Sequence, residues 1–507
     1  MQRTKFAPWI MAGLNVLAFA LLLCVRNAES AAGNALFAAC LGLLAVDLLW
    51  AAFAKNSLGL WLFPAEIALV LLCHYPRQFA SVDIHNLRGT SLLAACAMFA
   101  MPLAAGLFFA LDALGVGRAW KEPGFLRMLK RLTAPALLGG LFFFALLGYD
   151  NMHNFGYSVH EFTTTRADYL LAALIFMISC LFLRLFWEAR EGGWKEHLWR
   201  HFSILTIFAV LAGYGSFGLL RGYLAFGRDA AAAEKEYTAM FGEPSADYAG
   251  ARQIPMSLPA LFFGIRNGED YEVVPDVVYC TVEEEGIFAG MRLAYDMYRP
   301  TAPDAHRSAV VMLHGSGGDK SKTDNPQRSR YLASKGYTVF ELQVGDWGEK
   351  GTGFPEGADT DWEFMLRNID RFFACAAAHE SGANFDSAFL MGSSMGGFLT
   401  TDYVYRFEHT YQDHGVRIRG IAPLYGVISE AEIDADSLPA FIFVGDHDGY
   451  VNVGDIYRLR EKYREAGNPN ALALTVSYGG HSCDIEFSSR PGQLQLYYLE
   501  RFFGQLR

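Results

Sequence analysis

Short stretches of the C-terminal half carry a nucleophile, carboxylates and a base in an order that could support acyl transfer. The first is Gly392-Ser393-Ser394-Met395-Gly396, which fits the pattern G-x-S-x-G between an apolar run and a helical pattern. In this pattern the serine sits at the tip of a sharp strand-to-helix turn, and the glycines avoid collision with the neighbouring strand and helix. Ser394 is therefore the predicted nucleophile, and Ser393 occupies the variable position.

A serine hydroxyl reacts well only when a histidine removes its proton and a carboxylate stabilises the resulting imidazolium. Two aspartates, Asp446 and Asp448, follow one apolar run, and His481 follows the next one. Serine, acid and histidine in this order along the chain are typical of folds that carry G-x-S-x-G at such a turn. We predict that His481 is the base and that one of the two aspartates is the acid.

Strands and helices that alternate along the chain must position these residues. Strand-like runs bounded by glycine and other turn residues are VVYCTVEE, MRLAYDMYRP, AVVMLHGSGG, YTVFELQVG, the start of FLMGSSMGG, IRGIAPLYG, LPAFIFVGD and LALTVSYGG, with a helix over 361–378. Short β-rich runs separated by helices predict an α/β fold, a doubly wound and mostly parallel sheet with helices on both faces. The carboxyl ends of its strands share one edge, where open α/β folds place their sites.

Residues from about 277 to 507 resemble the α/β-hydrolase superfamily, and look closest to its dienelactone hydrolase and prolyl-oligopeptidase-like branch. In that branch the acid commonly stands in G-x-x-D-x-x-V, which Gly445, Asp448 and Val451 match. The resemblance therefore implies Asp448 as the acid. Asp446 is the alternative, and we expect it to cap a turn or to hydrogen-bond its own loop.

The same resemblance extends to His314-Gly315-Ser316-Gly317-Gly318, which is similar to the HGxGG oxyanion loop. Backbone N–H donors there stabilise the charge that acyl transfer builds on the carbonyl oxygen. The resemblance implies one donor at Met395 and a second within 315–317, with Ser316 favoured and Gly315 next. No cofactor and no metal ion are expected in such a site.

The N-terminal half has the composition of a membrane domain. Hydrophobic residues form 52% of the whole chain and charged residues 19%, against roughly 25% charged in an ordinary soluble domain. Stretches long enough to cross a bilayer lie near 8–26, 33–54, 90–114, 168–187 and 201–226, and two shorter or interrupted ones near 58–74 and 134–149. We predict an α-helical transmembrane bundle of about seven spans over 1–226, a linker with several prolines over 227–275 and the hydrolase domain over 276–507.

The distribution of Lys and Arg predicts the orientation of the spans. Basic residues cluster in 3–5, 118–131 and 190–200, which fall on one side of a seven-span bundle. Short cytoplasmic loops are enriched in such residues, so the C-terminal half is expected on the extracytoplasmic face of a membrane such as the bacterial cytoplasmic membrane. Residues 1–30 also imitate a cleavable signal peptide; cleavage there would not change this location.

Charge excludes one class of partner and marks a few unusual residues. Residues 1–226 hold 17 of the 42 basic and 12 of the 53 acidic residues, so the remaining 25 and 41 make the second half acidic. Such a surface is poorly suited to nucleic-acid phosphates.

Polar groups inside membrane spans are candidates for function, and the sequence places Asp47, Glu66 and Asp112 there. We expect these three residues near span ends or facing the bundle interior. Loop residues that could contact a substrate or an ion are His153, His160 and Glu161.

The expected activity is hydrolysis of carboxylic esters of envelope-associated acylated glycans or lipids. A peptidase or an acyltransferase would use the same residues, and a transporter or sensor with a hydrolase-like binding domain is the alternative from another class. Transport would be favoured by internal repeats, and the sequence shows none.

The short connection 427–437 leaves little chain for a lid over the active site. We therefore expect the glycine-rich loop 346–361, with Trp347 and Trp362, to shape the access of substrate to the site.

Overall fold

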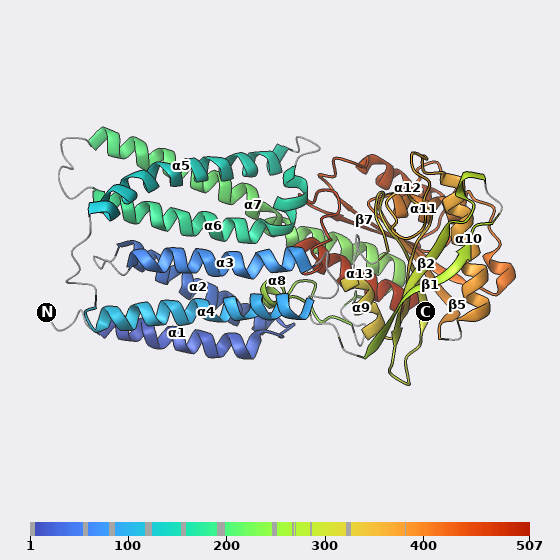
Figure 1. Cartoon of the computed structure of the whole chain (residues 1–507), viewed down its shortest axis with the longest axis horizontal. Helices are drawn as coiled ribbons and strands as arrows, with labels where there is room; N and C mark the ends of the chain where they lie inside the picture. Colours follow the sequence, from blue (N-terminus) through green and yellow to red (C-terminus); the bar gives the residue numbers. More distant parts are fainter. Residues whose placement is uncertain are drawn as a thin grey trace. The chain divides into compact units, whose positions relative to one another are not determined.

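The computed structural model describes residues 6–507 except for 54–58, 81–86, 117–123, 154–158, 190–197, 246–250, 266–267, 269, 284–285, 321–325 and 381. Contacts divide the chain into two compact units (Figure 1). The first comprises Met1–Ala80, Asn86–Leu224 and Met256–Gly264, and the second comprises Ser81–His85, Ala225–Pro255 and Ile265–Arg507.

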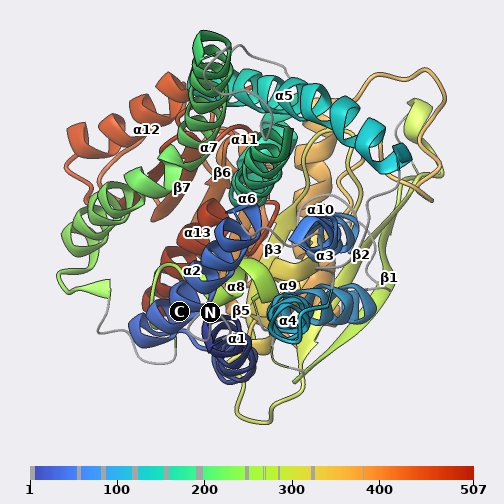
Figure 2. The same cartoon turned by 90° about the vertical axis from the view of Figure 1, so that its left-hand side faces the viewer.

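The first unit is a bundle of long helices, most of which Figure 2 shows nearly end-on. The helices are α1 (Phe6–Val25), α2 (Ala31–Phe53), α3 (Gly59–Ala80), α4 (Leu87–Ala113), α5 (Gly124–His153), α6 (Val159–Ala189), the N-terminal part of α7 (Leu198–Phe241) and the short α8 (Leu258–Phe263). Side chains such as Leu22, Phe37 and Phe63 are fully buried or nearly so between the helices. Others, such as Phe143 and Val210, remain exposed on the outer faces, as expected where the surrounding solvent is lipid.

Helix length and composition fit the predicted membrane spans. Within the described residues, five helices are long and apolar enough to cross a membrane: Phe6–Val25, Ala31–Phe53, Leu93–Ala113, Asp168–Trp187 and Trp199–Phe241. Two shorter apolar helices, Gly59–Leu72 and Pro135–Tyr149, coincide with the two interrupted stretches of the sequence. Membrane helices tolerate internal prolines such as Pro102 in α4, because neighbouring groups satisfy the freed backbone atoms. The prediction of a helical membrane domain is confirmed.

The second unit is built on an eight-stranded sheet in the order β1-β2-β4-β3-β5-β6-β7-β8. Its strands are β1 (Tyr271–Thr281), β2 (Arg292–Pro300), β3 (Ser308–Leu313), β4 (Thr338–Leu342), β5 (Asn384–Ser393), β6 (Ile418–Leu424), β7 (Ala440–Gly445) and β8 (Ala471–Val476). The β1–β2 and β2–β4 pairs are antiparallel, and the strands from β3 to β8 are parallel. The predicted mostly parallel sheet is therefore confirmed.

Burial explains why these strands read as continuous apolar runs. Every residue of β3, β4 and β7 is buried, because helices cover the sheet. The helices are α9 (Pro326–Ser334), α10 (Trp362–His379), α11 (Met395–Tyr405), α12 (Val453–Glu465) and α13 (Arg490–Leu506). Side-chain caps fix where several begin: Asp361 accepts from the N–H of Phe364 at the start of α10, and Ser489 accepts from Gly492 at the start of α13.

Helix α7 continues beyond its apolar stretch and becomes part of the second unit. The sequence places 227–241 in a linker, but the first proline after the alanine run is Pro244, so nothing interrupts the helix before Phe241. Tyr237 is fully buried in the core of the second unit. The Glu234 carboxylate accepts from the Ser245 N–H at 2.8 Å and from the Tyr498 hydroxyl of α13 at 3.1 Å. Residues 225–245 therefore help to complete the core of the second unit.

A truncated chain tests this assignment. We expect residues 260–507 to unfold at a lower urea concentration than residues 225–507. The shorter protein lacks residues that form hydrogen bonds with buried polar groups of α13. The Gln493 amide oxygen would lose the Arg252 guanidinium at 3.0 Å, and the Arg501 Nε would lose the Ser245 carbonyl at 2.7 Å. Breaking a buried charged network costs about 3–5 kcal/mol. Circular dichroism of both proteins in urea measures the difference, and equal midpoints would contradict it.

Candidate active site

Ser394 occupies a strained turn between β5 and α11. Its φ of 53° and ψ of −116° lie outside the ordinary region for a residue with a side chain. A Cβ on Gly392 would lie 2.1 Å from the carbonyl oxygen of Gly396, and one on Gly396 would lie 2.3 Å from the carbonyl oxygen of Leu313. Both flanking positions thus require glycine. Ser394 is half-buried, whereas Ser393 is 2% exposed.

The structure brings the predicted acid and base to Ser394. His481 Nε2 lies 3.0 Å from Ser394 Oγ, and His481 Nδ1 lies 2.8 Å from Asp448 Oδ2. The other oxygen of Asp448 accepts from the N–H groups of Tyr450 and Val451, both at 2.9 Å. Because a carboxylate accepts only, Nδ1 of His481 donates to it and Nε2 is left to accept the serine proton. The arrangement is suited to making Ser394 a nucleophile.

Asp446, the alternative acid, lies elsewhere in the same loop. Its Oδ1 accepts from the N–H of Tyr478 at 2.5 Å and lies 2.6 Å from His447 Nδ1. These contacts tie the loop after β7 to the loop after β8. The described hydrogen bonds of the Asp446 side chain are therefore to Tyr478 and His447, whereas His481 is hydrogen-bonded to Asp448.

The order of the strands that carry Ser394, Asp448 and His481 identifies the fold of the second unit. Ser394 follows β5, Asp448 follows β7 and His481 follows β8, so all three stand at the carboxyl edge of the parallel strands. The sheet order, the antiparallel second strand and the strained serine turn occur together in one known architecture. The C-terminal unit has the α/β-hydrolase fold.

Comparison with known proteins finds similar solved structures but no matching family model. No curated protein matches the sequence either. Among solved structures, a truncated carbohydrate esterase from gut microbiota is 15% identical and covers 47% of this chain and 98% of its own, with a TM-score of 0.35. A dienelactone hydrolase from Klebsiella pneumoniae is 15% identical over 46% of this chain and 99% of its own (TM-score 0.34). Brefeldin A esterase, a bacterial homologue of human hormone-sensitive lipase, is 13% identical over 55% and 85% (TM-score 0.36).

The backbone of the HGxGG-like loop narrows the choice of oxyanion donors. Met395 begins α11, so its N–H has no acceptor within the helix. The N–H of Gly317 is engaged, since it donates to Asp346 Oδ2 at 2.6 Å, and that of Gly318 donates to Gly315 O at 3.1 Å. Ser316, which is exposed, remains the favoured donor within the predicted stretch. The geometry is compatible with the predicted set of Met395, Ser316 and Gly315.

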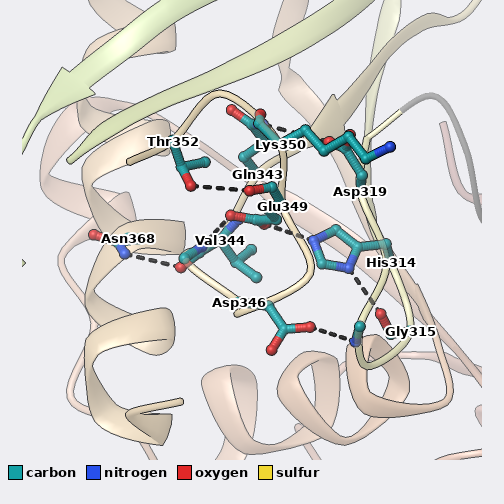
Figure 3. Close-up of polar contacts among 12 residues, drawn as sticks. His314, Gly315, Asp319, Gln343, Val344, Asp346, Glu349, Lys350, Thr352 and Asn368 are labelled. Atoms are coloured by element: carbon teal, nitrogen blue, oxygen red, sulfur yellow. Dashed lines mark hydrogen bonds and ion pairs between the residues drawn. The ribbon is translucent and has the colours of Figure 1, made fainter. Parts of the chain in front are cut away.

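A buried histidine–carboxylate pair supports this loop from behind, as Figure 3 shows. His314 Nδ1 lies 2.8 Å from the carbonyl oxygen of Gly315, and its Nε2 lies 2.6 Å from Glu349 Oε1. Both partners are hydrogen-bond acceptors, so a ring protonated at both nitrogens can donate to each of them. Glu349 is held in turn by the N–H groups of Val344 at 2.6 Å and Gly345 at 2.9 Å. The pair thereby fixes the Gly315 peptide against the loop after β4.

The role of this pair can be measured. We expect Glu349→Gln and His314→Gln to lower kcat for ester hydrolysis by about 10- to 100-fold with little change in KM, because a loosened Gly315 peptide weakens transition-state contacts more than substrate binding. His306→Gln is the matched control, since His306 precedes β3 at its opposite end. Steady-state kinetics of the three variants make the comparison. A KM effect alone, or an equal loss in the control, would contradict the assignment.

Tryptophan residues of the predicted access loop have separate positions. A Cβ on Gly317 would lie 2.8 Å from Trp347 Cζ2, so the exposed Trp347 ring packs directly on the oxyanion loop. Trp362 begins α10 and donates its Nε1–H to Asp402 Oδ2 on α11 at 2.6 Å. Trp347 therefore lies beside the predicted oxyanion donors, whereas Trp362 ties α10 to α11.

Several contacts of His481 were not predicted from the sequence. The Tyr425 ring meets the imidazole edge-on, with the ring centres 4.9 Å apart, and the exposed Tyr450 ring lies 5.0 Å away. Asp229 of α7 accepts from the N–H and the hydroxyl of Ser477 at 2.9 and 2.7 Å, four residues before the histidine. These groups orient the loop that carries the base. No local sequence signal marks them, because each contact depends on how distant elements pack.

Other residues singled out in the sequence have simpler placements. Cys483, two residues after His481, is fully buried in the core. His153, His160 and Glu161 lie outside the residues whose side chains the structure describes. The connection between β6 and β7 spans only 425–439, so the described chain has no long insertion at that point.

Proposed function

We propose that this protein is a membrane-anchored serine hydrolase that cleaves carboxylic esters. The observation that carries the proposal is the hydrogen-bonded chain from Ser394 through His481 to the buried Asp448. A serine on a strained turn, next to a histidine that a carboxylate orients, is equipped for nucleophilic attack on an acyl carbon.

The proposed reaction passes through an acyl-enzyme. Ser394 Oγ attacks the ester carbonyl while His481 Nε2 accepts the hydroxyl proton, and Asp448 stabilises the imidazolium. N–H donors at Met395 and in the Gly315–Ser316 stretch stabilise the oxyanion, each contributing about 2.7–4 kcal/mol. The protonated His481 then gives its proton to the leaving alcohol. Water repeats the sequence, releasing the carboxylic acid and restoring Ser394.

The proposed location is the extracytoplasmic face of a bacterial cytoplasmic membrane, with acylated glycans or lipids of the envelope as substrates. Support comes from the apolar helices of the first unit and from the clusters of Lys and Arg in 3–5, 118–131 and 190–200. An ester substrate held at a membrane surface would meet an enzyme anchored in that membrane more often than it would meet a soluble enzyme. Protease protection of the C-terminal unit in spheroplasts tests the orientation: digestion from outside is expected, and protection would contradict it.

Covalent labelling tests the activity itself. The detergent-solubilised full chain is treated with a fluorophosphonate, and the adduct is located by mass spectrometry. We expect one adduct, on Ser394, together with hydrolysis of p-nitrophenyl esters and no release of p-nitroaniline from peptide anilides. A folded protein that gives no adduct would contradict the esterase proposal, and preferential cleavage of the anilides would favour a peptidase.

A further inference from the structure

The membrane unit contains three polar side chains deep among its helices. Asn15 lies near the middle of α1, Asp47 lies on α2 and Glu66 lies on α3. Their exposed fractions are 0%, 1% and 2%. Burying a carboxylate costs several kcal/mol unless it is neutralised or paired, so each of these acids needs a compensating partner.

The structure shows oxygen atoms without such a partner. Both carboxylate oxygens of Asp47, Oε1 of Glu66 and Oδ1 of Asn15 are buried and have no hydrogen-bond partner among the described residues. The amide Nδ2 of Asn15 donates to Met11 O of its own helix at 3.1 Å, which leaves Oδ1 for another ligand. Helix α2 packs against both α1 and α3, and Asp47 lies near enough to Asn15 and Glu66 for their side chains to interact with it. Oxygen atoms from three helices thus gather in one place.

Among the described residues, no basic side chain is hydrogen-bonded to the Asp47 carboxylate. The side chains around the three polar residues, including Leu48 and Phe63, belong to the apolar core of the bundle. The guanidinium of Arg184 on α6 donates to the carbonyl oxygen of Ala51, one helical turn from Asp47, at 3.4 Å. Two acids close together in apolar surroundings are stabilised when a cation binds between them or when a carboxylate takes up a proton.

We propose that Asn15, Asp47 and Glu66 form an intramembrane binding site for a small monovalent cation, a proton or Na⁺. Carboxylate and amide oxygens are hard ligands, which suit hard cations and not soft metals. Ionisable groups inside membrane bundles are retained where they bind or relay ions. The site is separate from the hydrolase chemistry and gives the helical bundle a function beyond anchoring.

Cation binding is tested on the full-length protein in lipid nanodiscs. Thermal unfolding is followed in NaCl and in choline chloride at equal ionic strength, because a ligand that binds the folded state raises Tm with the logarithm of its concentration. Infrared spectroscopy in choline chloride then detects the carbonyl band of a protonated carboxylic acid. The isosteric variants Asp47→Asn and Glu66→Gln are compared with Asp112→Asn, which removes a buried acid near the end of α4.

The result decides between the two cations. A rise of Tm with Na⁺ that disappears in Asp47→Asn and Glu66→Gln but persists in Asp112→Asn would support Na⁺. No Na⁺ effect, with an acid band at neutral pH that those same two variants remove, would support the proton. Should either variant fail to fold, Asp47→Glu and Glu66→Asp keep the carboxyl group and are expected to shift the band or the Na⁺ response. A wild-type protein with neither a Na⁺ response nor an acid band would overturn the proposal.

Discussion

Ser394→Ala is expected to lower kcat for p-nitrophenyl ester hydrolysis by roughly 10⁶-fold, because no other group can form the acyl-enzyme. The hydroxyl is the atom that His481 Nε2 contacts at 3.0 Å. Alanine keeps a Cβ at the strained φ, so the turn itself is expected to persist. Initial rates at saturating ester, with circular dichroism as a check on folding, measure the loss.

Ser393→Ala is the matched control, since it removes the same atom from the adjacent residue. Ser393 is the last residue of β5 and is buried, so we expect a change in stability and a kcat within a few-fold of wild type. An inactive Ser393→Ala beside an active Ser394→Ala would mean that the wrong serine was assigned.

Asp448→Asn should have the second largest effect, a loss of about 10⁴-fold in kcat. Asparagine keeps the shape of the side chain, but its amide favours the wrong tautomer of His481 and cannot stabilise the imidazolium. The loss should appear in kcat with little change in KM, because Asp448 lies behind the histidine and accepts from its Nδ1 at 2.8 Å. Single-turnover measurement of acylation separates this step from product release.

Asp446→Asn distinguishes the two aspartates of this loop. Asp446 holds the Tyr478 N–H and lies against His447, so its loss should loosen the loop and cost activity far less than Asp448→Asn. If Asp446→Asn were the more damaging variant at unchanged stability, the acid would have to be reassigned.

The proximity of Ser394, Asp448 and His481 could be predicted because each residue directly follows a buried strand. Parallel strands place all their carboxyl ends on one edge, and the glycines around Ser394 mark a turn that leaves no space for side chains. Glu349 carries no comparable signal. It lies seven residues after β4 ends, and its importance arises only when that loop folds back on His314.

The helical bundle was predictable from hydrophobic length alone, but its interior was not. Asp47 and Glu66 are separated by 19 positions in the sequence, and nothing in that spacing brings Asn15 beside them. The extension of α7 was missed for another reason. Prolines at 244, 255 and 259 suggested a broken linker, while the burial of Tyr237 and Asp229 depends on strands and helices more than 200 residues away.

Helix α7 also restricts how this protein can have changed during evolution. One unbroken helix, Leu198–Phe241, contains both the apolar span and Asp229, which holds the loop before His481. Inserting a single residue between Asp229 and Tyr237 would rotate one side chain by about 100° relative to the other, so the two could not both keep their places in the second unit. Recombination that kept the C-terminal fold would therefore have to keep residues 225–241 with the sheet, so this part of α7 is expected to be inherited together with the C-terminal half.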